Sequence, residues 1–92
     1  MKKAAKIIVK GTVQGVFFRQ FVKGHAEDLK LRGFCRNLDS GDVEIIVEGE
    51  KEAIERLARF VKEGPEHSQI RSVEVSERRW SGDFSEFKVL RF

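Results

Sequence analysis

Hydrophobic side chains in the first third of the chain change their spacing once. Residues 4–13 (AAKIIVKGTV) are rich in β-branched side chains and contain Gly11 near their end, which predicts a strand that runs into a turn. From Arg19 onward, apolar residues recur at steps of about four, which predicts an amphipathic helix that ends near Gly33. The residues with this period are Phe21, Val22, His25, Ala26 and Leu29.

A polar turn at residues 39–42 (DSGD) separates two further short apolar segments. Residues 34–38 and 43–47 predict two strands, and the glycine of the turn permits the positive φ that a hairpin needs. A second amphipathic helix follows and is stopped by Gly64-Pro65. Its apolar face consists of Ala53, Ile54, Leu57, Phe60 and Val61.

The last third of the chain returns to the alternating pattern of strands. Apolar positions within residues 70–75 indicate a fourth strand, and after a turn at residues 81–83 a last strand is expected over residues 84–92. The order is β-α-β-β-α-β, with a possible extra strand. It is typical of the ferredoxin-like two-layer sandwich of the α+β class, in which two helices cover one face of a mostly antiparallel sheet.

Composition sets limits on size and compartment. A chain of 92 residues is long enough for one core, so we expect a single domain over residues 1–92. No segment resembles a signal peptide or approaches the length of a membrane span, and a single cysteine excludes an intramolecular disulfide, so a cytoplasmic location is expected. The 36% of charged residues and the single asparagine favour a heat-adapted source.

The segment GTVQGVFFR at residues 11–19 has the features of an anion site. A turn between the first strand and the first helix directs backbone N–H groups into a helix N-terminus, and Arg19 adds a planar fork suited to phosphate. The turn comprises Gln14, Gly15, Val16, Phe17 and Phe18. On chemistry alone, these residues also fit a packed turn with a solvated Arg19, because helix N-termini attract acids more often than arginines. The net charge of +3 is compatible with nucleic acid as well as with small anions.

Few other side chains carry chemistry. Asn37 ends the second strand, where its amide can hold a water in line for attack or simply open the hairpin turn. Cys35 is expected to be a small buried hydrophobe and not a nucleophile. His25 and His67 are not expected to pair as metal ligands, and neither a Walker loop nor a dinucleotide fingerprint is present.

Together, these segments resemble one known family. GTVQGVFFR, GFCRNLDSGDVEIIVEG at residues 33–49 and EGP at residues 63–65 are similar to acylphosphatases, in the same order and with compatible spacing. The resemblance implies hydrolysis of acyl phosphates to a carboxylate and inorganic phosphate, without metal or cofactor. It also implies that Arg19 and Asn37 are catalytic and that the backbone amides of residues 14–18 bind the phosphoryl group.

Two alternatives remain at this stage. A ferredoxin-like domain that binds RNA would need exposed aromatic residues on its central strands, and the segments GFCRNL and VEIIVEG do not supply them. Nucleic acid and membranes are therefore not expected as partners. The second alternative is a regulatory or carbamoyl-phosphate-handling part of a larger enzyme; the short chain without evident linkers favours a free-standing enzyme.

Overall fold

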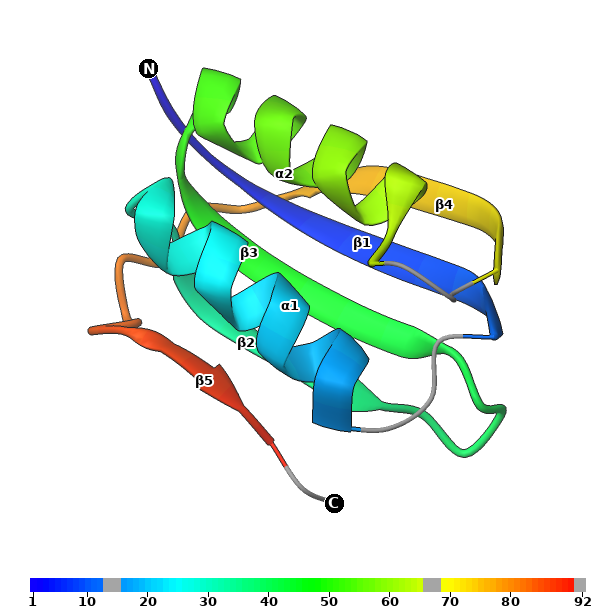
Figure 1. Cartoon of the computed structure of the whole chain (residues 1–92). Coiled ribbons are helices and arrows are strands. Elements are labelled where there is room, and N and C mark those ends of the chain that lie inside the picture. Colours follow the sequence, from blue (N-terminus) through cyan, green and yellow to red (C-terminus); the bar gives the residue numbers. More distant parts are fainter. Residues whose placement is uncertain (13–15, 66–68, 91–92) are drawn as a thin grey trace.

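The computed structural model describes residues 1–12, 16–65 and 69–90, which form one sheet and two helices. Both helices cover the same face of the sheet (Figure 1). The elements are β1 (Lys2–Thr12), α1 (Val16–Asp28), β2 (Arg32–Asn37), β3 (Val43–Glu50), α2 (Lys51–Glu63), β4 (Gln69–Arg78) and β5 (Phe87–Val89). Neither helix is long and apolar enough to cross a membrane within these described residues.

The strands lie in the order β4-β1-β3-β2-β5. Neighbouring strands are antiparallel, except that β5 runs parallel to β2 at one edge. Helix α1 packs over β2 and β5, and helix α2 packs over β1, β3 and β4. The predicted α+β sandwich is confirmed, including the extra strand, which is β5.

The hydrophobic core lies between the sheet and the helices. On the central strand β3, Val43, Ile45 and Val47 are fully buried and contribute to this core, whereas Glu44 and Glu48 alternate with them on the opposite face. Burying each of these valine and isoleucine side chains contributes about 1.5–3 kcal/mol. The helices add Phe18, Val22, Ala26, Ile54, Leu57 and Val61 to the same cluster.

Helix α1 ends earlier than the predicted boundary near Gly33. The Leu31 N–H donates to the Ala26 carbonyl at 2.9 Å and the Lys30 N–H donates to the Glu27 carbonyl at 3.0 Å, which is the Schellman pattern of a helix end. Lys30 has the left-handed φ of 60° that this motif requires. Gly33 belongs instead to β2, where a Cβ would collide with the Ile46 carbonyl.

The predicted last strand over residues 84–92 begins too early, because β5 spans Phe87–Val89; residues 91–92 lie outside the described residues. The preceding crossover from β4 to β5 lies against the sheet face that the helices leave open. There the buried Glu48 carboxylate accepts hydrogen bonds from the Ser81 N–H and hydroxyl, both at 2.8 Å, and from the Gly82 N–H at 2.9 Å. These contacts anchor the crossover at Ser81 and Gly82, before the segment in which the last strand was expected.

Candidate active site

The carboxyl ends of β1 and β2 lie at the same end of the sheet, which forms one edge of the molecule. Both strands are antiparallel to β3, and Val43 is the partner of Val9 on one side and of Asn37 on the other. Helix α1 begins after β1 at this edge, so its N-terminus and Asn37 lie at the same end of the molecule (Figure 1). The topology therefore brings together two segments that sequence reasoning selected separately.

The first turn of α1 contains part of the predicted phosphate loop. The helix begins at Val16, so the prediction that Val16, Phe17 and Phe18 form a turn before the helix is wrong. The N–H groups of the first helical turn have no acceptor inside the helix, and the helix dipole makes that end partly positive. No acidic residue lies in this turn to neutralise it. Gln14 and Gly15 lie outside the described residues.

Phe17 and Phe18 occupy opposite environments within this turn. Phe18 is 3% exposed and belongs to the core, where its ring stacks on Phe21 with centroids 6.1 Å apart. Phe17, one residue earlier and thus about 100° away around the helix, is 87% exposed. Phe18 therefore fixes the first turn of α1 on the core, while the side chain of Phe17 projects into solvent.

Arg19 follows directly and is held over β2. Its carbonyl accepts a weak hydrogen bond from the Cys35 thiol, with an Sγ–O distance of 3.9 Å. Cys35 and Asn37 are two residues apart on one strand, so their side chains leave the same face of the sheet, the face that carries α1. Arg19, which is half-buried, and Asn37 consequently belong to the same layer at the same edge.

Asn37 carries an unusual polar atom. Its Oδ1 is buried and has no hydrogen-bond partner among the residues that the structure describes. Leaving a buried acceptor unsatisfied costs about 1–3 kcal/mol, so native proteins retain such atoms chiefly where water, an ion or a ligand completes them. The amide is thus suited to hold a small polar molecule at this edge.

Cys35 has no features of a nucleophile. Its side chain is fully buried, and this burial raises the pKa of the thiol to about 12, although the positive charges of Arg19 and Lys23 oppose the shift. The thiol is therefore protonated at neutral pH, and the prediction of a small buried hydrophobe is confirmed. In the described part of the chain, no group of three or more His, Cys, Asp or Glu side chains is placed to hold a metal ion.

His25 takes part in the packing of the two helices. His25 stacks on Phe60 at 4.1 Å and meets Phe21 edge-on at 4.6 Å, so it joins the two helices. His67 lies outside the described residues. Sequence reasoning missed Glu48, whose carboxylate anchors the crossover, because it is one of three glutamates in β3 and no local pattern distinguishes it.

The fold is a two-layer α+β domain. At this edge the partly positive N-terminus of α1 lies at the same end of the molecule as the buried Oδ1 of Asn37. Comparison with known proteins gives the same class. The acylphosphatase family model matches residues 5–89 of the chain. A curated acylphosphatase of Alkalilimnicola ehrlichii is 47% identical over 76 residues, which cover 83% of this chain and 85% of that protein.

Solved structures agree with this match. The crystal structure of acylphosphatase from Bacillus subtilis gives a TM-score of 0.90 at 38% identity and covers 98% of this chain and 99% of that one. HypF of T. kodakarensis gives a TM-score of 0.82 at 36% identity over 96% of this chain but 12% of that longer chain. The chain belongs to the acylphosphatase family, a group of hydrolases that act on acid anhydrides. The resemblance in the sequence is thereby confirmed.

Proposed function

We propose that the chain hydrolyses the carboxyl-phosphate bond of acyl phosphates to a carboxylate and inorganic phosphate. The backbone amides of residues 14–18 and Arg19 hold the phosphoryl group, and Asn37 positions the attacking water. The observation that carries this proposal is the buried Oδ1 of Asn37, which has no hydrogen-bond partner among the described residues and lies at the edge where α1 begins. Residues 13–15 are outside the described chain, so the Gln14 and Gly15 amides enter by family resemblance alone.

Phosphoryl binding follows from two kinds of donor. The unpaired N–H groups at the start of α1 point out of the helix along its axis and attract anions. Arg19 adds a permanent charge with a planar fork that matches two phosphoryl oxygens. Both kinds of donor stabilise the negative charge that shifts over the phosphoryl oxygens during transfer, without forming a covalent bond.

The role of Asn37 follows from the geometry of its amide. A buried Oδ1 that accepts a hydrogen bond from water fixes the orientation of that water and leaves a lone pair of the water oxygen directed at phosphorus. The leaving carboxylate is stable without a proton, so the reaction needs no general acid. In this proposal it also needs no metal or cofactor, because positioning and fixed positive charge supply the catalysis.

The test is phosphate release from benzoyl phosphate in excess EDTA. We expect Asn37→Ala to lower kcat by about 10²–10³ with little change in KM, which is the typical cost of losing one preorganised group. Arg19→Ala should lower kcat and raise KM together, because its charge acts in binding and in turnover. Gln20→Ala is the matched control, since it removes an exposed amide next to Arg19. A rise in KM alone for Asn37→Ala, or equal losses in the control, would contradict the proposal.

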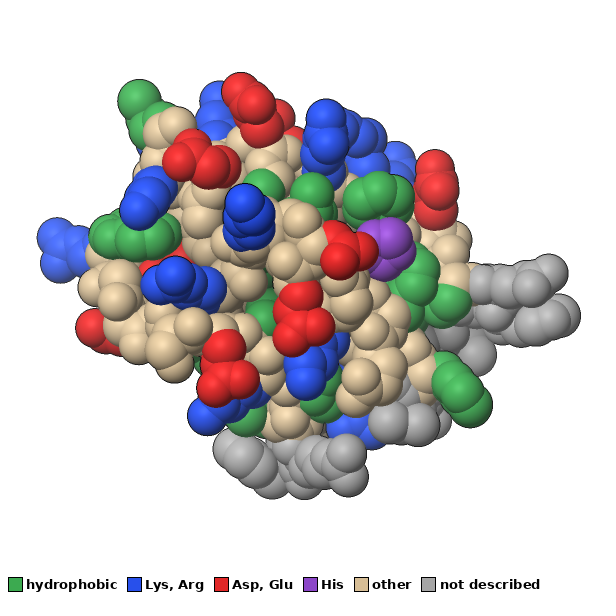
Figure 2. Space-filling model, turned by 60° about the vertical axis from the view of Figure 1, so that its left-hand side comes forward, with side chains coloured by type: hydrophobic (Ala, Val, Ile, Leu, Met, Phe, Trp, Pro, Cys, Tyr) green, Lys and Arg blue, Asp and Glu red, His purple; other side chains and the backbone are tan. Residues whose placement is uncertain are grey.

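Nucleic acid is not a partner in this proposal, and the compartment that we propose is the cytoplasm. On the face that Figure 2 shows, Lys and Arg side chains are interspersed with Asp and Glu and form no patch of one sign. The open face of the central strand β3 presents Glu44, Ile46 and Glu48, which offer no stacking surface for bases. Phe34 on β2 is half-buried, and its ring packs edge-on against Phe84 at 5.9 Å.

A further inference from the structure

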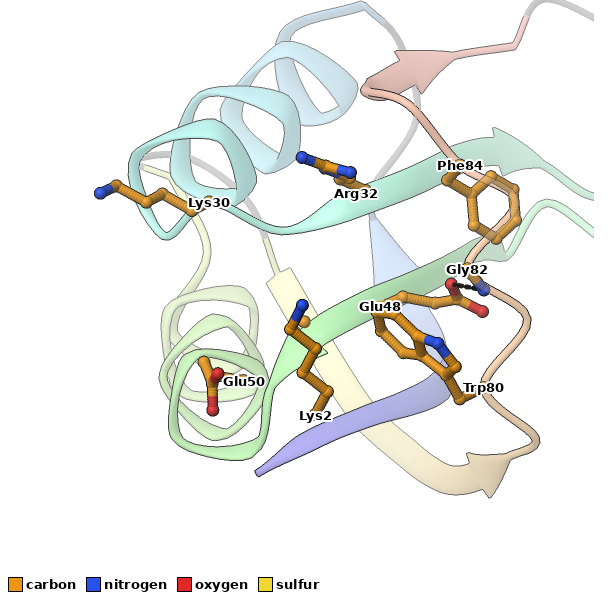
Figure 3. A pocket seen from close by; sticks show the side chains of 9 residues that line it. Lys2, Lys30, Arg32, Glu48, Glu50, Trp80, Gly82 and Phe84 are labelled. Carbon is orange, nitrogen blue, oxygen red and sulfur yellow. Dashed lines mark hydrogen bonds between the residues drawn. The ribbon is translucent and has the colours of Figure 1, made fainter.

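A depression lies at the end of the molecule opposite to the candidate active site. It forms where β1 and β2 begin, under the crossover that leads to β5, and its volume is about 170 Å³. Figure 3 shows that Lys2 of β1, Lys30 of the turn after α1 and Arg32 of β2 border it from separate segments. Trp80 and Phe84 of the crossover form its aromatic walls.

The acidic side chains that line this depression already have donors. Both oxygens of the Glu48 carboxylate accept hydrogen bonds from Ser81 and Gly82 of the crossover. Glu50 accepts a hydrogen bond from the Met1 amino group at 2.7 Å. Glu48 is therefore held by the crossover, and Glu50 is held chiefly by the Met1 amino group, with a smaller contribution from the charge of Lys2.

Among the described residues, the basic side chains form no close ion pair, although the charge of Lys2 helps to lower the pKa of Glu50. Lys2, Lys30 and Arg32 form no ion pair within the described part of the chain, whereas Lys6, Lys10 and Arg36 on the same sheet do. The Lys2 Nζ lies 5.7 Å from the centre of the Trp80 ring, a cation–π distance. The depression consequently has an excess of positive charge next to an aromatic surface.

Lys30 is retained at a position that favours another residue. Its φ of 60° lies in the left-handed region, and the C′ position of a Schellman motif is usually occupied by glycine. For a residue with a Cβ this conformation costs energy that glycine avoids. In Figure 3 the Lys30 side chain extends away from the depression, so the turn at Lys30 borders it while the ammonium points outward, where its charge complements the end of the α1 dipole.

We infer that this depression binds a small aromatic carboxylate. Arg32 offers a planar fork that matches a carboxylate, and Lys2 adds a further charge beside Trp80. Trp80, which is 42% exposed, and the half-buried Phe84 provide a surface for one ring. The volume suits such a ligand, because an engineered apolar cavity of about 150 Å³ holds a benzene molecule.

The experiment uses benzoate and the single tryptophan of the chain as its reporter. Because Trp80 is the one indole, its Nε1–H gives one resonance in a ¹H–¹⁵N correlation spectrum, and this resonance reports on the depression and not on the opposite edge. We expect a saturable shift of the resonance with benzoate and a much weaker response to acetate, which lacks the ring. Equal affinities for benzoate and acetate would overturn the role of the aromatic walls.

Two variants test the charges. Arg32→Gln should weaken benzoate binding at least about tenfold, while Arg56→Gln on α2, the same change on the other layer, should leave it unchanged. Lys30→Gly should raise the melting temperature by relieving the left-handed strain and leave benzoate binding unchanged, because the Lys30 side chain points away from the depression. The contrast with Arg32→Gln separates loss of a ligand contact from a change in stability. Absence of a saturable shift in the wild type, or equal weakening by Arg56→Gln, would overturn the inference.

Discussion

Replacing Glu48 with glutamine tests how the crossover is held on the sheet. The carboxylate is 3% exposed and accepts hydrogen bonds from the Ser81 N–H, the Ser81 hydroxyl and the Gly82 N–H. Glutamine keeps the shape but has one acceptor oxygen, so its amide group must face a backbone N–H donor. A hydrogen bond to a charged group contributes about 1.5–3 kcal/mol, and we expect Glu48→Gln to lower the free energy of unfolding by about that amount.

The effect should depend on pH in a defined direction. Burial alone would raise the pKa of the Glu48 carboxyl, but hydrogen bonds from Ser81 and Gly82 outweigh it and hold the pKa below its ordinary value of 4.5. The charged form is thus favoured by folding, so its contribution to stability is fully present above pH 4.5. It is lost as the pH falls through the lower pKa of the folded state. The difference between wild type and variant should shrink there.

Urea unfolding followed by circular dichroism at pH 7 and at pH 3 provides the measurement. Glu74→Gln is the matched control, since Glu74 lies on the same open face but is 63% exposed in its 3.3 Å ion pair with Lys10. Such exposed pairs contribute about 0–1 kcal/mol. If the two variants lose the same stability at pH 7, or if the Glu48 difference persists unchanged at pH 3, the assigned role of the buried carboxylate is wrong.

Two further predictions concern the packing of α1 against β2. Burial raises the pKa of the Cys35 thiol to about 12, so the folded protein should not react with a thiol reagent such as DTNB at pH 8. The thiol should react once the protein is unfolded in guanidinium. Fast reaction of the native protein would contradict this prediction. Phe18→Ala should cost about 3–5 kcal/mol of stability because Phe18 is in the core. Phe17→Ala should cost less than about 0.5 kcal/mol by the same unfolding measurement. Similar losses for both variants would refute the assignment of Phe18 to the buried side of α1 and of Phe17 to its exposed side.

Most of the fold could be predicted from the sequence because its elements have clear periods. The alternation in residues 43–47 and the four-residue steps from Phe21 predict β3 and α1, and both exist. The start of α1 was misjudged because Gly15 suggested a longer turn, although Phe18 and Val22 already share the helical spacing. The length of β5 was overestimated because Glu86 continues the alternation of polar and apolar residues although it is not part of the strand.

The site could be predicted only in part, for a physical reason. Arg19 and Asn37 were selected one by one, but their shared edge follows from β3, which pairs with both β1 and β2. Long-range contacts cannot be read from local periods. Glu48 meets Ser81, and Lys2 meets Trp80, across large separations in sequence, so neither the anchored crossover nor the depression beside it was predictable.

Helix α1 relates the two charged edges of the molecule to each other. Its N-terminus supplies partly positive N–H groups beside Asn37, and its last turn leads to Lys30, where a cation also complements the partly negative end of the helix dipole. Between these ends the helix packs on the core through Phe18, Val22 and Ala26, and the nearby Cys35 thiol is uncharged. Apolar packing therefore separates the two edges, so loss of charge at Arg32 should act on benzoate binding without altering phosphate release.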